Sequence, residues 1–176
     1  LELVRSRLGK SLPIDPKPMD LADAAHTAIA EACAGNPDCD PTVRVEGDTR
    51  GVWDAGRLGQ LLQNLIGNAL QHGLDKRDVT VTLHGEPDTV RLTVHNYGTP
   101  ISANAIGTIF DPLVRNADEE LGQPSTSLGL GLFIVKEVVD AHAGTIEVSS
   151  NETDGTLFTV VLPRNSLLEL PQAAIF

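Results

Sequence analysis

Apolar residues recur at helical spacing in three segments of the chain: 21–34, 58–72 and 128–144. Asp20 and Asp54 precede the first two segments, and aspartate is among the residues preferred at helix N-caps. Gly144 ends the third segment in the manner of a helix C-terminus. The pattern therefore predicts three main helices, with a short fourth helix around residues 102–109.

The remaining apolar residues alternate with polar ones, as they do in half-buried strands. Residues 42–53 are expected to form a short hairpin, and the segments 78–86 and 89–96 to pair as antiparallel neighbours. The segments 145–150 and 155–163 predict a second hairpin. Elements in this order predict an α+β fold, a two-layer α/β sandwich. Its mixed, mostly antiparallel sheet is expected to carry three helices on one face.

Composition divides the chain into one main unit and short flanking parts. Residues 1–10 have the pattern of the end of a helix and begin without a methionine, which indicates a fragment. Three prolines mark residues 11–19 as an extended linker. Residues 20–165 hold the predicted domain, and its loop 111–128 has the composition of a mobile surface loop. The tail 166–176 shows no clear pattern.

Charge and composition argue against some classes of partner. The formal net charge of −11 disfavours nucleic acid or an anionic membrane surface, but not a nucleotide held in a local pocket. No apolar run is long enough to cross a bilayer. Cys33 and Cys39 suit either a disulfide or two thiols in a reducing compartment, and their spacing is poor for zinc.

The second predicted helix has an unusual polar flank. Gln60, Asn64, Asn68 and Gln71 lie beside its apolar face, and the segment 61–73 contains no Lys, Arg, Asp or Glu. Asparagine is a poor helix former, so two of them in mid-helix suggest a function. An amide oxygen is a neutral, hard ligand that coordinates Mg²⁺ without adding negative charge beside phosphates. An ordinary polar flank of an amphipathic helix is the alternative.

A glycine pair, Gly129 and Gly131, stands at the start of the third predicted helix. Glycines let backbone N–H groups approach phosphate oxygens, and a helix N-terminus favours anions. The third glycine of a Rossmann fingerprint is missing, because Ile134 occupies that position, and no Walker Gly-Lys-Ser/Thr follows. From the glycines alone, a phosphate-binding turn and a flexible hinge both remain open.

Together these motifs resemble the catalytic ATP-binding domain of sensor histidine kinases. That family shares the Bergerat-type fold with gyrase, the heat-shock chaperone ATPase and mismatch-repair ATPases. QNLIGNALQHG resembles the N box, and HNYGTPI lies where the first glycine box belongs. IFDPLVR resembles the F box, SLGLGLFIVKEVVDAHAGTIEV the second glycine box with its helix, and GTLFTVVLP the last glycine box. The five motifs follow the family order, and the resemblance covers residues 18–163.

The resemblance implies where Mg²⁺ and the phosphates of ATP bind. Asn68 is the expected magnesium ligand and Asn64 lines the same metal–phosphate site, so both are the expected catalytic residues. His72 ends the N box and is expected near the phosphates. The second glycine box contributes four consecutive residues to phosphate binding: Gly129, Leu130, Gly131 and Leu132.

The resemblance also implies the adenine end and a lid. Asn96 stands where the family usually has an aspartate that accepts the adenine amino group; its neutral oxygen still accepts, but more weakly. Gly98 is expected to give the base close access to the backbone, and Thr156 to hold it through a hydroxyl or a water. Residues 111–128 are the expected ATP lid, with Phe110 as its anchor.

A second departure from the family lies at Gln71, where many relatives place a lysine or arginine towards the phosphates. Arg115, which is counted among the expected ATP-binding residues, and Lys136 are the candidates to replace that charge. The two departures, at Asn96 and Gln71, both remove a charge from the expected site.

The implied reaction is phosphoryl transfer from Mg-ATP to a histidine, and onward to an aspartate of a response regulator. The acceptor is expected on a dimerisation domain whose helix hairpin ends in residues 1–10. Four histidines of the chain lack the acidic neighbour and proline of a phosphoacceptor: His26, His84, His95 and His142. The parent protein is expected to be a cytoplasmic homodimer, with its membrane attachment left open. A non-catalytic nucleotide-sensing regulatory module and a serine kinase of the anti-sigma-factor type are the alternatives.

Overall fold

The protein is described by a computed structural model that covers residues 12–112 and 130–165. The predicted helix end in residues 1–10, the loop residues 113–129 and the tail 166–176 lie outside the described residues. Within the described residues, no helix has both the length and the apolar character needed to span a bilayer.

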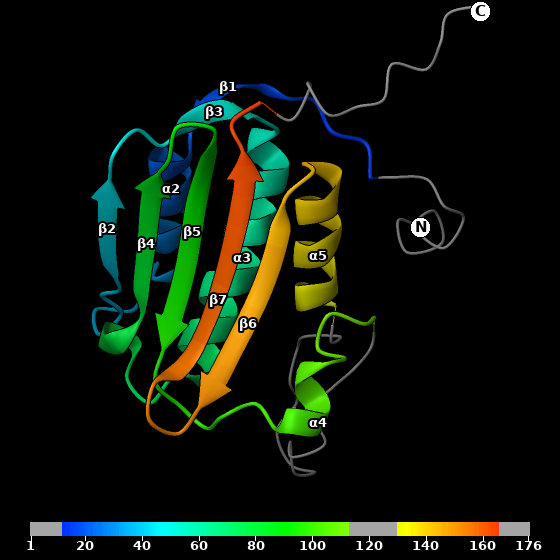
Figure 1. Cartoon of the computed structure of the whole chain (residues 1–176). Helices are drawn as coiled ribbons and strands as arrows, with labels where there is room; N and C mark the ends of the chain where they lie inside the picture. Colours follow the sequence, from blue (N-terminus) through cyan, green and yellow to red (C-terminus); the bar gives the residue numbers. More distant parts are fainter. Residues whose placement is uncertain (1–11, 113–129, 166–176) are drawn as a thin grey trace, which may run out of the picture.

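A five-stranded mixed sheet is the centre of the fold (Figure 1). Its strands, in the order in which they lie side by side, are β2 (Thr42–Glu46), β4 (Thr80–Gly85), β5 (Thr89–Asn96), β7 (Gly155–Pro163) and β6 (Thr145–Asn151). β2 runs parallel to β4, and the other neighbours in this sheet are antiparallel. The predicted mixed sheet and its two antiparallel pairs, β4–β5 and β6–β7, are confirmed.

Three main helices cover one face of this sheet, as predicted (Figure 1). They are α2 (Leu21–Ala32), α3 (Ala55–His72) and α5 (Gly131–Ala141), and the short α4 (Ala103–Ile106) and the 3-10 turn η1 (Lys76–Asp78) complete the described helices. Asp20 and Asp54 cap α2 and α3, because their carboxylates accept backbone N–H groups of the first turn. These caps start both helices where the sequence predicts them.

The apolar faces of α3 and of the strands form the core. Six residues of α3 are buried and recur at helical spacing: Leu58, Leu61, Leu62, Leu65, Ile66 and Ala69. They share one core with alternate residues of the central strands, such as Leu92 of β5 and Phe158 of β7. Burial of this face leaves the amide flank of α3 at the edge of the core.

The predicted hairpin over residues 42–53 is wrong. β2 pairs with β4 in the main sheet, whereas β3 (Arg50–Trp53) pairs antiparallel with β1 (Lys17–Asp20) in a separate two-stranded sheet. Alternation identifies both strands but carries no information about their partners. Gly47 has a φ of 72° in the turn after β2. The partner of β3 is β1, which begins in the last residues of the predicted linker 11–19.

Cys33 and Cys39 form a disulfide in the loop between α2 and β2. Backbone hydrogen bonds close the same loop: the N–H of Asn36 donates to the carbonyl of Cys33, and the N–H of Cys39 donates to the carbonyl of Asn36. Of the two cysteine states that the sequence leaves open, the structure shows the disulfide.

Candidate functional site

The amide flank of α3 lies against the start of α5. Asn64 is half-buried, and its Nδ2 donates to the carbonyl of Gln60 one turn earlier, at 2.9 Å. Its Oδ1 lies so close to Gly131 that a Cβ on that glycine would stand 2.9 Å away. Asn68 follows one turn later on the same flank and is half-buried as well. The fold thus brings residues of the predicted N box and second glycine box into contact.

α5 begins where the sequence predicts a phosphate-binding turn. Leu130 is its N-cap residue, and the helix starts with Gly131 and Leu132. Within the described part of the chain no side chain caps this N-terminus, so its first N–H groups point out of the helix without a capping partner. Such N-termini attract anions, because the exposed N–H groups carry partial positive charge. Gly129 and Arg115 lie outside the described residues.

A buried polar cluster forms at the ends of β5, β7 and β6. Asn96 and Thr156 are 3% and 5% exposed and are paired in the β5–β7 register. The Oγ1 of Thr156 and the Oγ of Ser150 are 2.7 Å apart, and Ser150 Oγ also accepts the N–H of Ile101 at 2.9 Å. The sequence did not single out Ser150, because its position beside Thr156 depends on the pairing of β6 with β7.

Close backbone packing fixes the end of α3 to the end of β5. Gly73 and Gly98 form an isolated antiparallel bridge, and the N–H of Leu74 donates to the carbonyl of Tyr97 at 2.8 Å. A Cβ on Gly98 would lie 2.2 Å from the carbonyl oxygen of His72. Gly98 therefore has a packing reason to be glycine that does not depend on a bound base.

α3 connects the start of α5 with the buried polar cluster around Asn96 and Thr156. Its middle contacts Gly131 through Asn64, and a Cβ on Gly73 at its C-terminal end would lie 3.6 Å from the Cβ of Asn96. At 1.5 Å per residue, these two contacts are about 14 Å apart along the helix. We call the flank of α3 from Asn64 to Gly73 the α3 strip.

Two more predicted residues, His72 and Phe110, differ in exposure. His72 is exposed at the last position of α3. Phe110 is half-buried and lies edge-on to the buried Phe158, with ring centroids 6.4 Å apart. This contact anchors the chain shortly before the segment that lies outside the description.

Among the described residues, the site carries little charge of its own. Lys136, a candidate to replace the charge absent at Gln71, pairs with Asp140 instead: its Nζ lies 2.5 Å and 2.6 Å from the two carboxylate oxygens. Residues 12–112 and 130–165 contain no cluster of three or more His, Cys, Asp or Glu side chains suited to a metal ion. Mg²⁺ commonly takes few protein ligands and completes its shell with water and phosphate oxygens, so the single amide of Asn68 fits it.

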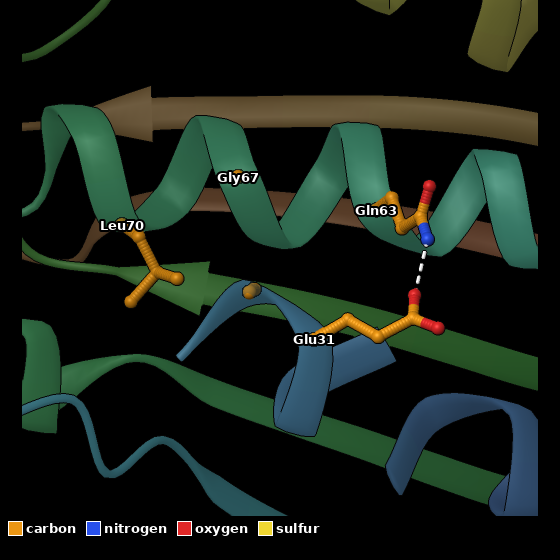
Figure 2. Close-up of a pocket in the computed structure, with 5 residues that line it drawn as sticks. Glu31, Gln63, Gly67 and Leu70 are labelled. Atoms are coloured by element: carbon orange, nitrogen blue, oxygen red, sulfur yellow. Dashed lines mark hydrogen bonds between the residues drawn. The ribbon is translucent and has the colours of Figure 1, made fainter. Parts of the chain in front are cut away.

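A separate groove lies between α2 and α3 (Figure 2). It has a volume of about 430 Å³ and is lined by five residues of α2 and α3: Glu31, Ala32, Gln63, Gly67 and Leu70. Gln63 donates to the carboxylate of Glu31 at this groove. None of the predicted ATP-binding residues lines it, so it is distinct from the α3 strip.

Comparisons with known proteins identify the family of the chain. The sequence profile of the family described as histidine kinase-, DNA gyrase B-, and HSP90-like ATPase matches residues 53–166. The bacteriophytochrome of Pseudomonas aeruginosa is 30% identical over 164 residues, which are 93% of this chain and 22% of that protein. The probable sensor histidine kinase TcrY of Mycobacterium tuberculosis is 35% identical over 162 residues, 92% of this chain and 34% of that protein. The chain therefore spans about a fifth to a third of the length of these relatives.

Solved structures share the fold. The mycobacterial sensor histidine kinase MprB has a TM-score of 0.70 at 22% identity, over 86% of this chain and 99% of that one. Full-length ShkA in complex with AMPPNP has a TM-score of 0.70 at 24% identity, over 90% of this chain and 33% of that one. At these identities the common fold is shown.

Proposed function

Because this chain belongs to the histidine kinase-, DNA gyrase B-, and HSP90-like ATPases, as the ATP-binding catalytic domain of a sensor histidine kinase, we propose that it binds Mg-ATP along the α3 strip. The observation that carries the proposal is the contact of Asn64 with Gly131, which joins the amide flank to the start of α5. The regulatory-module and serine-kinase alternatives are not favoured, since the similar proteins include several sensor histidine kinases.

At the phosphate end of the site, Asn68 offers its amide oxygen to Mg²⁺ and Asn64 lies beside the phosphates. Neutral ligands suit this place, because the phosphates already bring negative charge. Backbone N–H groups at the start of α5, from Gly131 and Leu132, donate to phosphate oxygens. ATP supplies the phosphoryl group, and the domain acts mainly by holding it in position. Leu130 with Gly129, His72 and Arg115 complete the proposed phosphate-binding residues.

At the other end of the strip, the buried cluster binds the adenine. The Oδ1 of Asn96 accepts the adenine amino group, and the hydroxyl of Thr156, held by Ser150, reaches the base directly or through a water. Gly98 keeps the backbone close to the base. Phe110 anchors the start of the segment that the family resemblance assigns as the lid.

The activity of the whole protein is proposed to need parts other than the 176 residues of this chain. Its relatives are several times longer, so the acceptor histidine and the dimerisation helices are proposed to lie in another part of the parent protein. The parent is proposed to act as a cytoplasmic homodimer that passes its phosphoryl group to a response regulator. In this arrangement the chain binds ATP but does not complete autophosphorylation alone.

Phosphorylation with radiolabelled Mg-ATP tests this function. The isolated chain should bind ATP without forming phosphohistidine, and a dimerisation domain with its acceptor histidine, supplied separately, should become labelled. Asn68→Ala should abolish the labelling, whereas Gln63→Ala, which removes an amide of the groove between α2 and α3, should preserve it. Phosphohistidine on the isolated chain would contradict the division of labour, and an absence of ATP binding would reject the site.

A further inference from the structure

A fully buried histidine joins the end of α5 to the start of α3. His142 is 0% exposed and directly follows the last residue of α5. Its Nε2 accepts the backbone N–H of Asp54 at 3.1 Å, and its Nδ1 lies 2.7 Å from the carbonyl oxygen of Val138. A backbone N–H only donates, so Nε2 carries the lone pair and Nδ1 carries the proton that Val138 accepts. Both bonds together require the neutral imidazole.

Asp54, to which His142 is bound, is a junction of three segments. Its Oδ1 accepts the N–H of Arg57 at 3.0 Å and caps α3. Its Oδ2 accepts the N–H of Asp15 at 2.8 Å, in the segment that leads into β1. Because its own N–H donates to His142, one residue ties the chain ahead of β1, the start of α3 and the end of α5.

α3 and α5 lie side by side and run in opposite directions (Figure 1). One end of their interface is the bond between Asp54 and His142, and the other is the contact of Asn64 with Gly131. About 15 Å of α3 separates these two contacts. The side chains buried between them are apolar and interdigitate, so they favour a register without a directional bond. The hydrogen bond adds a directional constraint at one end of the interface, because its distance and angle have narrow limits.

We propose that His142 is a positioning residue of the nucleotide site, which sets the register of α3 against α5 through Asp54 and thereby the spacing of Asn64 and Gly131. Because Asp54 also holds Asp15, the same junction transmits the position of the segment ahead of β1 to the phosphate end of the site. This inference rests on the proposed function, since it concerns the regulation of the same site. His142 lies at the far end of both helices from the α3 strip, so its effect passes through α3 and α5.

The environment of the junction favours the neutral imidazole. Burial lowers the pKa of His142 below its ordinary value, and the bond to Val138 and the charge of Asp54 oppose this lowering only in part. Burial acts to raise the pKa of Asp54, but three backbone N–H donors and the nearby His142 bring that pKa below its ordinary value. A charged carboxylate and a neutral imidazole are the states that the observed bonds need.

Two substitutions of His142 separate the two hydrogen bonds that its ring makes. His142→Gln keeps an acceptor at about the reach of Nε2, whereas His142→Asn keeps a donor near Val138 and is too short to reach Asp54. NMR signals of the Gly131 backbone amide and the Asn64 side-chain amide, recorded without nucleotide, report the far end of the interface. Titration with ATP in the presence of Mg²⁺ reports the site itself, and thermal melting reports the fold.

His142→Asn should move both NMR signals and weaken ATP binding by about fivefold, the effect of one lost hydrogen bond. His142→Gln should resemble the wild type in both measurements. The inference is overturned if His142→Asn melts at a lower temperature but leaves either the signals unmoved or the ATP affinity within about twofold of the wild type. A wild-type chain that binds no ATP refutes the proposed function. In that case the two NMR signals still test whether His142 sets the register of α3 against α5.

The segment ahead of β1 is tested with a matched pair of variants. Asp15→Pro removes the N–H that Asp54 accepts, and Asp15→Ala keeps that N–H while removing the same side chain. The proline variant should move the Gly131 signal, and the alanine variant should leave it in place. Equal signals in the two variants would overturn the link from this segment to the site.

Discussion

Asn96 shows how a single residue sets the character of the site. It is 3% exposed and paired with Thr156, in a place where the family usually has a carboxylate. A buried carboxylate costs stability unless it is paired, whereas an amide accepts the adenine amino group without that cost. The neutral residue therefore favours the stability of the nucleotide-free protein, at the cost of a weaker hydrogen bond to the base.

Substitution Asn96→Asp should separate these two effects. The fold should lose about 1–3 kcal/mol of unfolding free energy, because a poorly paired charge is buried. ATP affinity should stay equal or increase, since a charge-assisted hydrogen bond to the adenine is stronger. Melting and ATP titration measure both, with the exposed Asn104→Asp as a control for added charge. A large loss of affinity would show that the pocket depends on the amide.

Gly131 provides a second test at the scale of the residue. Gly131→Ala should make the helix more favourable by up to about 1 kcal/mol, but its Cβ would lie 2.9 Å from Asn64 Oδ1 and displace that amide. We therefore expect weaker ATP binding without a loss of stability. Gly67→Ala is the matched control, because nothing lies within 4 Å of its added Cβ, and it should raise stability with unchanged affinity. Unchanged ATP binding in Gly131→Ala would remove Asn64 from the site.

At the scale of elements, the junction of α3 with α5 should make stability depend on pH. The folded protein holds His142 neutral with a lowered pKa, whereas the unfolded chain binds a proton below the ordinary value of 6.5. Between these two pKa values the unfolded state carries more protons than the folded state. The contribution of His142 to the free energy of unfolding should therefore be fully present above pH 6.5 and be lost as the pH drops towards the folded pKa. Asp54 acts in the same direction only in stronger acid, since its lowered pKa belongs to a carboxyl group.

Urea unfolding of the wild type and His142→Gln between neutral and mildly acidic pH measures this dependence. The wild type should lose more stability than the variant, by up to about 1.4 kcal/mol per pH unit in the steepest part. The other four histidines are common to both proteins and cancel in the comparison. Parallel pH profiles would show that His142 titrates alike in the folded and unfolded chains.

The loop between α2 and β2 is an element that should matter for stability alone. Reduction of the Cys33–Cys39 disulfide should lower the free energy of unfolding by about 2 kcal/mol, the effect expected for a short closed loop. ATP affinity should not change, because the described α3 strip and α5 contain neither cysteine. A Cys33→Ser, Cys39→Ser double variant should be insensitive to reductant. A change in ATP affinity on reduction would connect this loop to the site.

At the scale of the whole molecule, local patterns predicted the helices and strands, whereas long-range contacts determined which strands pair. The main helices and both antiparallel pairs follow from caps and periodicity, which neighbouring residues determine. The partner of β3 did not follow, since it is supplied by β1 from a distant segment. Within the proposed site, the motifs point to Asn64 and Asn96, but the contacts of Ser150 and His142 join separate elements and are contained in no local pattern.

Mg-ATP is proposed to bind along the α3 strip with Asn68 as the magnesium ligand. Calorimetric titration of the chain with ATP, with Mg²⁺ and with a chelator, tests it most directly. The wild type should bind ATP in a Mg²⁺-dependent way, and Asn68→Ala should weaken that binding by at least about tenfold at an unchanged melting temperature. Unchanged Mg²⁺-dependent affinity in Asn68→Ala would contradict the assignment of Asn68 as the magnesium ligand.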